Sequence, residues 1–379
     1  MVEKRIGILG GGQLGKMLYQ AGSTKHLSMF IMENDDTCPA HIVCPNFTRG
    51  SITNFDEVVA FGKNMDVVTI EIENVNVEAL EYLQANGVEV YPQPSVIKVI
   101  KDKGLQKMFY EGYKIPTAKY QLFENAEEIK QSIRDKTWSI PFVQKMRKDG
   151  YDGKGVQIIR SESEVENLYD QPSIVEQKID VLAEISVIVA RAKDGKIVAF
   201  PGVQMEFHPT ANLVEYLFSP PDIPIEIQKE TVEIALKVAD KLGIVGLLAV
   251  EMFITKENEI LVNEVAPRPH NSGHHTIEAN YTSQYEQHLR CILGMPLGST
   301  NAHHVAAMIN LLGEDGYVGD TKYEGLEAIL KEEGVYSHLY GKKTTKPFRK
   351  MGHITVIGKE LNDVKKLAKD IYKKVKVIA

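Results

Sequence analysis

The chain of 379 residues has little cysteine and tryptophan, with three Cys and one Trp. Cys38, Cys44 and Cys291 are an odd number and include no CxxC pair, so we expect neither a disulfide framework nor a cysteine metal site. No stretch of about 18 apolar residues is present, which predicts no membrane-spanning helix. The apolar run after Arg5 is short and enters a glycine turn, unlike a secretory signal. These features predict a reduced, cytoplasmic protein.

An excess of positive charge is also lacking. The chain has 44 Lys and Arg against 51 Asp and Glu, a net charge of −7. Proteins that bind nucleic acid broadly are usually basic, so we expect no nucleic-acid partner. Small anions remain possible ligands, because a local cluster of cations can hold a phosphate. With 43% hydrophobic and 25% charged residues, the chain is typical of a soluble globular protein, and its length predicts two or three domains.

Residues 1–98 have short apolar strands that alternate with helical patterns, which predicts a doubly wound parallel sheet. The expected strands are residues 4–9, 27–33, 66–71 and 88–91. A linker at 91–95 and a lysine-rich helix at 96–113 are expected next. Closely spaced strand patterns then predict an antiparallel α+β region, at 142–145, 156–159, 173–177, 184–190 and 197–200.

A long amphipathic helix is predicted at 226–242, starting after Pro224. Two strands are expected to follow at 246–254 and 259–264, joined by a turn at 256–258. A last region begins near residue 301. Its expected elements are strands at 306–311, 337–340 and 352–357, a helix near 326–333, and a basic helix at the end.

The first glycine loop, Gly10–Gly15, lies between a predicted strand and a predicted helix. Gly10, Gly12 and Gly15 fit G-x-G-x-x-G, and Glu33 ends the second strand, which together match a dinucleotide fingerprint. Such a loop brings backbone N–H groups and a helix N-terminus close to a phosphate. The loop alone leaves three possibilities open: NAD(P) or FAD, another phosphorylated ligand, or a tight turn that binds nothing.

The second glycine loop carries more information. Gly150, Gly153 and Gly155 lie within six residues between two predicted strands, beside Lys145 and Lys154. A hairpin of this kind can fold over a polyphosphate and offer it N–H groups and cations. The loop lacks the Walker pattern, and its alternative interpretation is a plain hairpin turn.

Two acids are predicted to face each other on the strands at 246–254 and 259–264. Glu251 and Glu264 have strongly apolar neighbours, where two like charges repel and raise a pKa. A divalent cation relieves this repulsion, and Mg²⁺ prefers one or two carboxylates together with phosphate oxygens. Asn263 adds an oxygen ligand. The alternative is a pair of solvated acids on an edge strand.

A polar run, residues 266–275, follows the second acid directly. Arg268 offers a fork of donors for an anion. Its histidines, His270, His274 and His275, lack a Cys or HExxH context, which disfavours zinc. We interpret the run as a binding loop, with a solvent-exposed loop as the alternative.

Taken together, these motifs resemble the ATP-grasp superfamily and, within it, the 5-(carboxyamino)imidazole ribonucleotide synthases. The matching strings follow the family's order and span nearly the whole chain. They are GILGGGQLGKM (7–17), IEIENV (70–75), GYDGKG (150–155), VEQKI (175–179), NEVAPRPHNSGH (263–274), YGK (340–342) and RKMGHITV (349–356).

The resemblance implies a pre-ATP-grasp domain at 1–98, an ATP-grasp domain at 99–300 with a small lid lobe at about 118–178, and a C-terminal domain at 301–379. It implies a ligase that uses ATP and Mg²⁺, or Mn²⁺, to phosphorylate bicarbonate to carboxyphosphate. The amine of 5-aminoimidazole ribonucleotide (AIR) is then carboxylated, with release of ADP and phosphate. It also implies a homodimer, and AIR rather than a dinucleotide at the first glycine loop.

The resemblance further implies a role for each matching residue. ATP would contact Lys103, Lys145, Gly150, Tyr151, Asp152, Gly153, Lys154, Gly155, Glu176, Gln177, Lys178, Ile179, Glu184, His208, Asn263 and Glu264. AIR and bicarbonate would contact Gly12, Gln13, Leu14, Glu73, Tyr151, Asp152, Arg268, His270, Asn271, Ser272, Lys342, Arg349 and Lys350. The catalytic group would be Asp152, Lys154, Arg268 and His270, and the metal ligands Glu251 and Glu264. Lys103 departs from the family, which usually has Arg there.

Three alternatives remain at this point. The chain can be an ATP-grasp ligase for formate or an amino acid, a Rossmann dehydrogenase, or a nucleotide sensor without catalysis. A sensor is expected to lack one of the paired acids, and both are present here.

Overall fold

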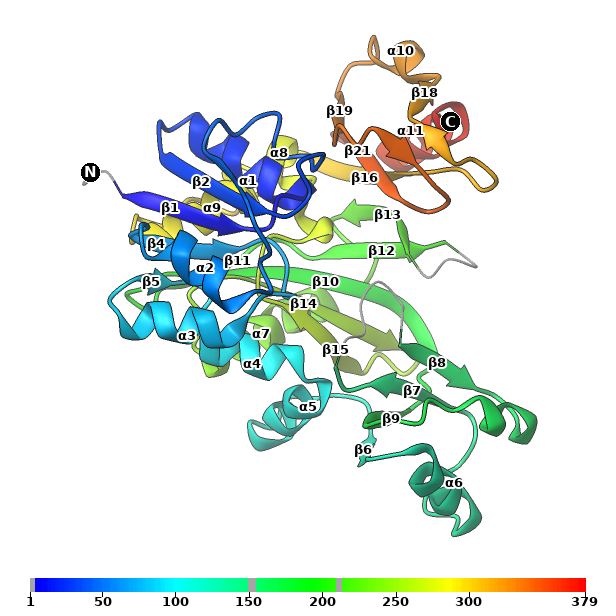
Figure 1. The fold of residues 1–379 in the computed structure, drawn as a ribbon. Coiled ribbons are helices and arrows are strands. Elements are labelled where there is room, and N and C mark those ends of the chain that lie inside the picture. The colour runs from blue at the N-terminus through cyan, green and yellow to red at the C-terminus, as the bar shows by residue number, and fades with distance from the viewer. Residues whose placement is uncertain (1–3, 149–154, 209–212) are drawn as a thin grey trace.

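The computed structural model describes residues 4–148, 155–208 and 213–379. A parallel sheet forms the first domain, in the strand order β3-β2-β1-β4-β5, which confirms the predicted doubly wound arrangement (Figure 1). Its strands are β1 (Arg5–Leu9), β2 (Ser28–Glu33), β3 (Phe47–Arg49), β4 (Val67–Ile70) and β5 (Glu89–Val90). Helices α1 (Gln13–Ser23), α2 (Phe55–Gly62) and α3 (Val77–Ala85) connect them.

The single helix predicted at 96–113 is wrong, and the linker predicted at 91–95 is confirmed only at 91–93. Two helices occur there, α4 (Pro94–Lys101) and α5 (Lys103–Gly112). Pro94 takes the first position of α4, where proline's missing N–H costs nothing. Asp102 separates the helices, because its backbone is extended and its carboxylate accepts the N–H groups of Gly104 and Leu105.

A nine-stranded antiparallel sheet runs through the middle of the molecule, in the order β15-β14-β10-β12-β13-β16-β21-β19 with β11 beside β10. The strands are β10 (Val181–Arg191), β11 (Ile197–Ala199), β12 (Val203–Phe207), β13 (Val214–Ser219), β14 (Gly246–Thr255), β15 (Ile260–Ala266), β16 (Val305–Leu312), β19 (Val335–Leu339) and β21 (Lys350–Gly358). Sequence patterns missed β12 and β13. Because β13 pairs with β16, the C-terminal strands continue this sheet.

Helices cover both faces of β10 and β14. On one face α7 (Ile225–Leu242) buries Ala235 and Val238 against Val187 and Val250. On the other face α9 (Gln284–Leu293) contributes Cys291 to a second apolar cluster. Side chains alternate between the two faces of a strand, and β10 and β14 carry apolar residues at successive positions. Each face of the two strands therefore supports one apolar cluster.

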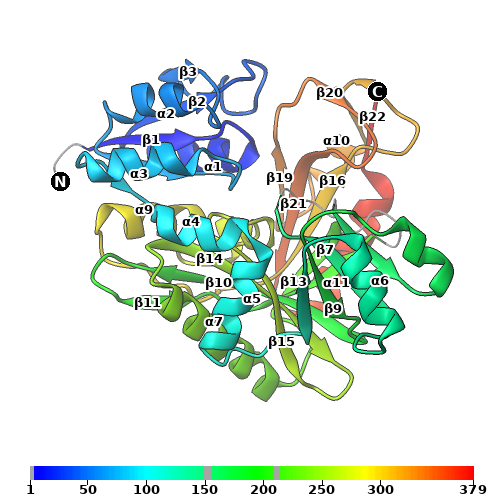
Figure 2. The ribbon, with the colours of Figure 1, turned by 60° about the horizontal axis from the view of Figure 1, so that its bottom comes forward.

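A small four-stranded sheet, in the order β6-β9-β7-β8, lies beside the β15 edge (Figures 1 and 2). Its strands are β6 (Tyr120–Phe123), β7 (Phe142–Met146), β8 (Val156–Ile159) and β9 (Ser173–Gln177), with α6 (Ala126–Arg134) and the 3₁₀ helix η1 (Glu162–Asn167). A bridge between Thr117 and Val262 joins the chain before β6 to β15.

The C-terminal residues pack α11 (Leu361–Lys374) against β16 and β21. The helix predicted near 326–333 is only one turn, α10 (Leu326–Ile329). Short elements complete this part: β17 (Gly319–Asp320), β18 (Lys322–Glu324), β20 (Thr344–Thr345) and β22 (Lys376–Ile378). Within the described residues, we find no helix with the length and apolar character needed to cross a membrane.

Candidate active site

The paired acids lie where the sequence predicted them. Glu251 on β14 is directly opposite Glu264 on β15, and the ladder is irregular just after this pair. The side chains of Glu251 and Glu264 are 17% and 43% exposed, so a ligand can reach both. Burial and the neighbouring Glu264 raise the pKa of Glu251 to about 8. The protein alone therefore does not stabilise both carboxylates in their charged form.

Lys103 provides one counter-charge. Its Nζ lies 2.6 Å from Oε2 of Glu264 at the start of α5. Its ammonium group is the largest influence on Glu264 and lowers the pKa of that carboxyl to about 2. Burial would lower the pKa of Lys103, but Glu264 outweighs burial and raises it. Lys103 thus keeps the Glu264 carboxylate ionised, whereas the charge of Glu251 has to be neutralised by another group.

A buried ion cluster lies next to the pair. The Glu176 carboxylate on β9 is 2.7 Å from Nζ of Lys107 and 2.7 Å from Nζ of Lys145. Lys145 also donates to Oδ1 of Asn263 at 2.8 Å. Burial alone would raise the pKa of Glu176, yet the two ammonium groups lower it to about 2. Lys145, Glu176 and Asn263, which the sequence assigned to ATP, are therefore brought together.

Lys107 is a site residue that the sequence interpretation missed. It is 3% exposed and points from α5 toward β9. The available signal was the lysine-rich stretch at 96–113. The sequence of that stretch does not show which lysine side chain is buried. The helix is interrupted at Asp102, and the interruption changes which residues lie on the same face.

Glu184 on β10 lies on the same face as Glu251, since Ser186 is opposite Glu251 and Glu184 is two residues away. Burial raises the pKa of Glu184 to about 7. Gln177 is exposed at the end of β9, and Lys178 pairs with Asp180 at 3.2 Å. Ile179 follows β9 outside any strand.

The polar run connects the acid pair with the first domain. Arg268 Nε lies 2.9 Å from Oε2 of Glu73, which follows β4. His270 Nε2 lies 3.4 Å from Oε1 of Glu251, and His270 Nδ1 lies 2.9 Å from the Ser272 hydroxyl. The polar run thus contacts the acid pair through His270 and the first domain through Arg268, and its predicted substrate role stays a prediction.

The 3₁₀ helix η2 (Asn271–Gly273) fixes the end of this surface, because the Ser272 hydroxyl lies 2.8 Å from the Ser186 hydroxyl of β10. A one-turn helix, α8 (Thr276–Ala279), follows. His274 is buried 2.9 Å from the Tyr285 hydroxyl, and burial lowers its pKa well below the usual value. Within residues 4–148, 155–208 and 213–379, no three His, Cys, Asp or Glu residues are arranged to hold a metal ion.

The first glycine loop is closed by the protein's own carboxylates. The N–H groups of Gly12 and Gly15 donate to the two oxygens of Glu71, at 3.0 and 2.8 Å. The N–H of Gly11 donates to Glu33 at 3.1 Å. Of the other predicted residues here, Gln13 begins α1 and is half-buried, whereas Leu14 is buried in the core. The N–H groups that a dinucleotide pyrophosphate would use are occupied, which disfavours the dinucleotide alternative.

The C-terminal cations lie together. Lys342 Nζ donates to the carbonyl oxygen of Lys350 at 2.7 Å, and Arg349 donates to that of Thr344 at 2.7 Å. The charge of Lys350 lowers the pKa of Glu251, although burial and Glu264 outweigh it. Lys342, Arg349 and Lys350 are called the C-terminal basic group below.

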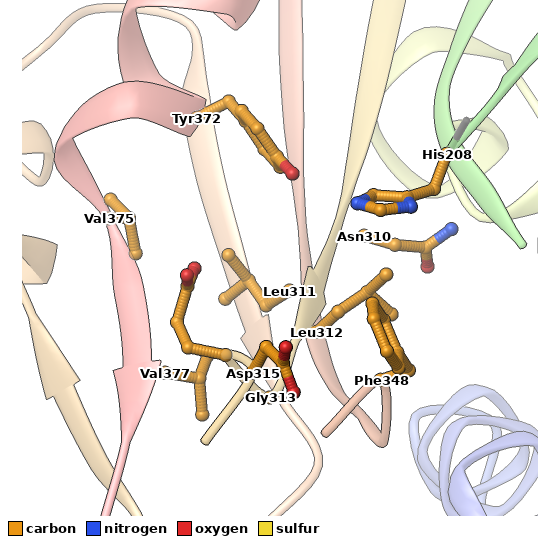
Figure 3. Close-up of a pocket in the computed structure, with 11 residues that line it drawn as sticks. His208, Asn310, Leu311, Leu312, Gly313, Asp315, Phe348, Tyr372, Val375 and Val377 are labelled. Carbon is orange, nitrogen blue, oxygen red and sulfur yellow. The ribbon is translucent and has the colours of Figure 1, made fainter. Parts of the chain in front are cut away.

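His208 lies at the end of β12, and its ring is 5.4 Å from the ring of Phe348 (Figure 3). It lines a cavity of about 210 Å³ with Asn310, Asp315 and Tyr372. None of the described acids and lysines of the Glu251 and Glu176 clusters lines this cavity. The assignment of His208 to ATP therefore stays a prediction, since this cavity is separate from those two clusters and most of the second glycine loop lies outside the described residues.

Part of the second glycine loop falls outside the described residues, namely Gly150, Tyr151, Asp152, Gly153 and Lys154. Gly155 is described, and its carbonyl oxygen accepts the N–H of Met146 at 2.8 Å. The strands β7 and β8 that flank the loop pair with each other, as the hairpin interpretation required.

Three family models match successive parts of the chain. They are the ribonucleotide synthetase preATP-grasp domain at 3–101, the ATP-grasp domain at 108–285, and the phosphoribosylaminoimidazole carboxylase C-terminal domain at 306–367. The chain is 35% identical to the N5-carboxyaminoimidazole ribonucleotide synthase of Bacillus subtilis, over 92% of this chain and 90% of the relative. It is also 35% identical to a chloroplastic phosphoribosylaminoimidazole carboxylase of Vigna aconitifolia, over 96% of this chain, but covers 66% of that longer protein.

Solved structures are similar over almost the whole chain. The N5-carboxyaminoimidazole ribonucleotide synthetase of Thermotoga maritima has a TM-score of 0.91 at 38% identity and covers 99% of both chains. The Aspergillus clavatus N5-carboxyaminoimidazole synthase, solved with ADP and AIR, has a TM-score of 0.89 at 28% identity and covers 98% of both chains. The chain therefore belongs to the N5-carboxyaminoimidazole ribonucleotide synthase family of ATP-grasp proteins.

Proposed function

We propose that this protein carboxylates AIR with bicarbonate at the expense of ATP, producing N5-carboxyaminoimidazole ribonucleotide, ADP and phosphate through carboxyphosphate. The observation that carries the proposal is the acid pair Glu251 and Glu264, which contacts Lys103 on one side and His270 of the polar run that includes Arg268 on the other. The lysines suit the ATP phosphates, the acids suit a cation, and Arg268 suits an oxyanion. The Aspergillus clavatus relative binds ADP and AIR, which supports the same ligands here.

Mg²⁺ fits the acid pair. Glu251 and Glu264 face each other, and burial together with repulsion from Glu264 raises the pKa of Glu251. Mg²⁺ characteristically uses one or two carboxylates together with substrate phosphates, so Glu251 and Glu264 would hold it with ATP, and Mn²⁺ is a possible substitute. When bound, the ion neutralises charge on the transferring phosphoryl group.

The protein's own groups would orient the other reactants. Lys145 and Lys107 would approach ATP phosphates from the small sheet and α5, with Glu176 holding both ammonium groups in place. Arg268 would stabilise the charge of bicarbonate and carboxyphosphate. The loop that includes Asp152 and Lys154 would cover the site and exclude water, because carboxyphosphate hydrolyses readily.

Proton release gives a first prediction. An acid whose pKa is raised to about 8 binds a proton in the metal-free protein at pH 7, and cation binding must displace it. Binding of ATP with Mg²⁺ should therefore release a proton from Glu251 at pH 7, and the release should decrease as the pH rises above 8. Calorimetry in two buffers of different ionisation enthalpy measures the number of protons released. Equal heats in both buffers at pH 7 would contradict the predicted state of Glu251.

The same raised pKa fixes a stability trend. The folded protein holds this proton up to higher pH than the unfolded chain, whose glutamate has a pKa of about 4.3. Through Glu251 alone, stability of the metal-free protein is therefore greatest below pH 4.3 and declines as the pH rises toward 8. Cation binding removes this penalty.

Lys342 provides a second prediction. Lys342→Ala should raise KM for AIR about 10- to 100-fold, the equivalent of losing one charge-assisted hydrogen bond, and leave kcat within about twofold. Its neighbour Lys343 is exposed, so Lys343→Ala is the matched control. An unchanged KM in the Lys342 variant would refute contact with the AIR phosphate.

The direct test is phosphate release with AIR, ATP and bicarbonate, each omitted in turn. ADP formation should require all three, and N5-carboxyaminoimidazole ribonucleotide should accumulate in step with it. Equal turnover with formate in place of bicarbonate would indicate another ATP-grasp ligase. Quenching of NADH fluorescence on binding would support the dehydrogenase alternative.

We further propose domains at 1–98, 99–300, with a lid lobe at about 118–178, and 301–379, supported by the succession of the three family matches. The family resemblance also leads us to propose a cytoplasmic homodimer that acts on AIR, bicarbonate and ATP without a nucleic-acid or membrane partner. Light scattering of the purified chain tests the oligomeric state.

A further inference from the structure

Glu71 directly follows β4, and its side chain reaches the first glycine loop. None of the roles proposed for the reaction involves this residue. Its side chain is buried, and each carboxylate oxygen accepts one loop N–H group. A methyl group at Gly12 would lie 2.6 Å from Oε1 of Glu71, and one at Gly10 would lie 2.4 Å from its Cγ. These glycines therefore make room for a carboxylate of the protein itself.

In nucleotide-binding proteins, N–H groups at a helix N-terminus hold a phosphate. Here two such groups point at Glu71, and a third, from Gly11, points at Glu33. Glu73 lies two residues beyond Glu71 and pairs with Arg268. A phosphate approaching this loop would have to displace a buried carboxylate and lie near further acids, which like-charge repulsion disfavours.

The C-terminal basic group has the opposite character. Lys342, Arg349 and Lys350 present three cations in the segment that leads into β21, whereas the loop is held by carboxylates. A ribonucleotide has hydrogen-bond donors at its ribose and amine and an anion at its phosphate. The ribose and amine donors are complementary to the carboxylates at the loop, and the phosphate is complementary to the cations of the basic group.

We propose that Glu71 determines the direction in which the substrate binds, by occupying the place of a phosphate at the glycine loop and so directing the substrate phosphate to the C-terminal basic group. This inference rests on the proposed function, because it takes AIR as the ligand of the loop. Glu71 is a specificity-determining residue that acts through the backbone N–H groups it holds.

The test compares ribose with ribose 5-phosphate as inhibitors competing with AIR, at saturating ATP, Mg²⁺ and bicarbonate. The inhibition constant of ribose divided by that of ribose 5-phosphate measures what the phosphate contributes to binding. In the wild-type protein the ratio should be about 10 to 100, one charge-assisted contact or more. In Lys342→Ala/Arg349→Ala it should fall to about 1, because Glu71 still blocks the loop.

Adding Glu71→Ala to that double variant should free the N–H groups of Gly12 and Gly15 and restore a ratio of about 10. Glu71→Gln in the same background fills the space with a neutral side chain, so its ratio should stay near 1. Glu78→Ala is the control, since Glu78 is an exposed acid of the same domain. A ratio that does not recover in a folded Glu71→Ala variant would overturn the inference.

The double variant tests the inference without changing Glu71. A ratio that remains near 10 in Lys342→Ala/Arg349→Ala, and also after Lys350→Ala is added, would mean that phosphate binds elsewhere despite Glu71. This result would overturn the inference even if the Glu71 variants fail to fold. Failure of the proposed function would look different. AIR would then not be carboxylated by the wild-type protein, or ribose 5-phosphate would not compete with it.

Discussion

Glu264→Gln should lower kcat by about 1,000-fold or more while the protein stays folded. The substitution preserves volume but removes one of two carboxylates proposed to hold the cation, which contributes several kcal/mol to stabilising transition-state charge. Lys103, 2.6 Å from Glu264, would add uncompensated positive charge where the cation should bind. Phosphate release at saturating ATP, AIR and bicarbonate measures the loss.

The control for this prediction lies on the same hairpin. Glu257 is exposed in the turn between β14 and β15, so Glu257→Gln changes the net charge equally without reaching the site. Its kcat should equal that of the wild-type protein. Thermal unfolding should shift by no more than a few degrees in either variant, because neither creates a cavity. A Glu264→Gln protein with wild-type turnover would rule out the magnesium assignment.

Arg268→Ala should lower kcat/KM by about 100- to 1,000-fold, the size of effect seen when one donor to a developing oxyanion is removed. Two losses combine in this variant. The guanidinium no longer stabilises charge on bicarbonate and carboxyphosphate, and Glu73 loses its partner at 2.9 Å. Arg268→Lys keeps the charge but not the planar fork, so it should recover only part of the activity.

Arg290 is the matched control for Arg268. It lies on α9, pairs with Glu286 at 2.6 Å and donates to the carbonyl oxygen of Pro296, and neither partner is a proposed site residue. Arg290→Ala should leave kcat/KM unchanged, because the half-buried ion pair that it breaks includes no proposed site residue. Separate measurement of KM for bicarbonate and AIR distinguishes the two roles of Arg268. Wild-type kinetics in Arg268→Ala would refute both.

Several strands and their pairing were predictable from local pattern. The apolar runs at 246–254 and 259–264 lie on either side of a short turn, and a hairpin of this kind brings Glu251 opposite Glu264. The helix at 226–242 was predictable because its apolar period is long and regular. In contrast, β12 and β13 have weaker patterns and are stabilised largely by their neighbours in the sheet.

Long-range partners explain most of what the sequence interpretation missed. Lys107 became a site residue only because Glu176, distant in the sequence, folds back to meet it. Asp102 breaks the predicted helix through a cap and an ion pair with Arg147 at 2.8 Å. His208, which the resemblance assigns to the nucleotide, lies beside Phe348, and its role stays a prediction.

The sequence by itself determined that this protein carries a glycine loop, a pair of acids on adjacent strands and a polar run beyond them, because these depend on residues close together in the chain. Only the tertiary structure decided what occupies the first glycine loop. The G-x-G-x-x-G pattern is the same whether its N–H groups meet a phosphate or a carboxylate. Glu71, brought there by the pairing of β4 with β1, is the partner in this protein.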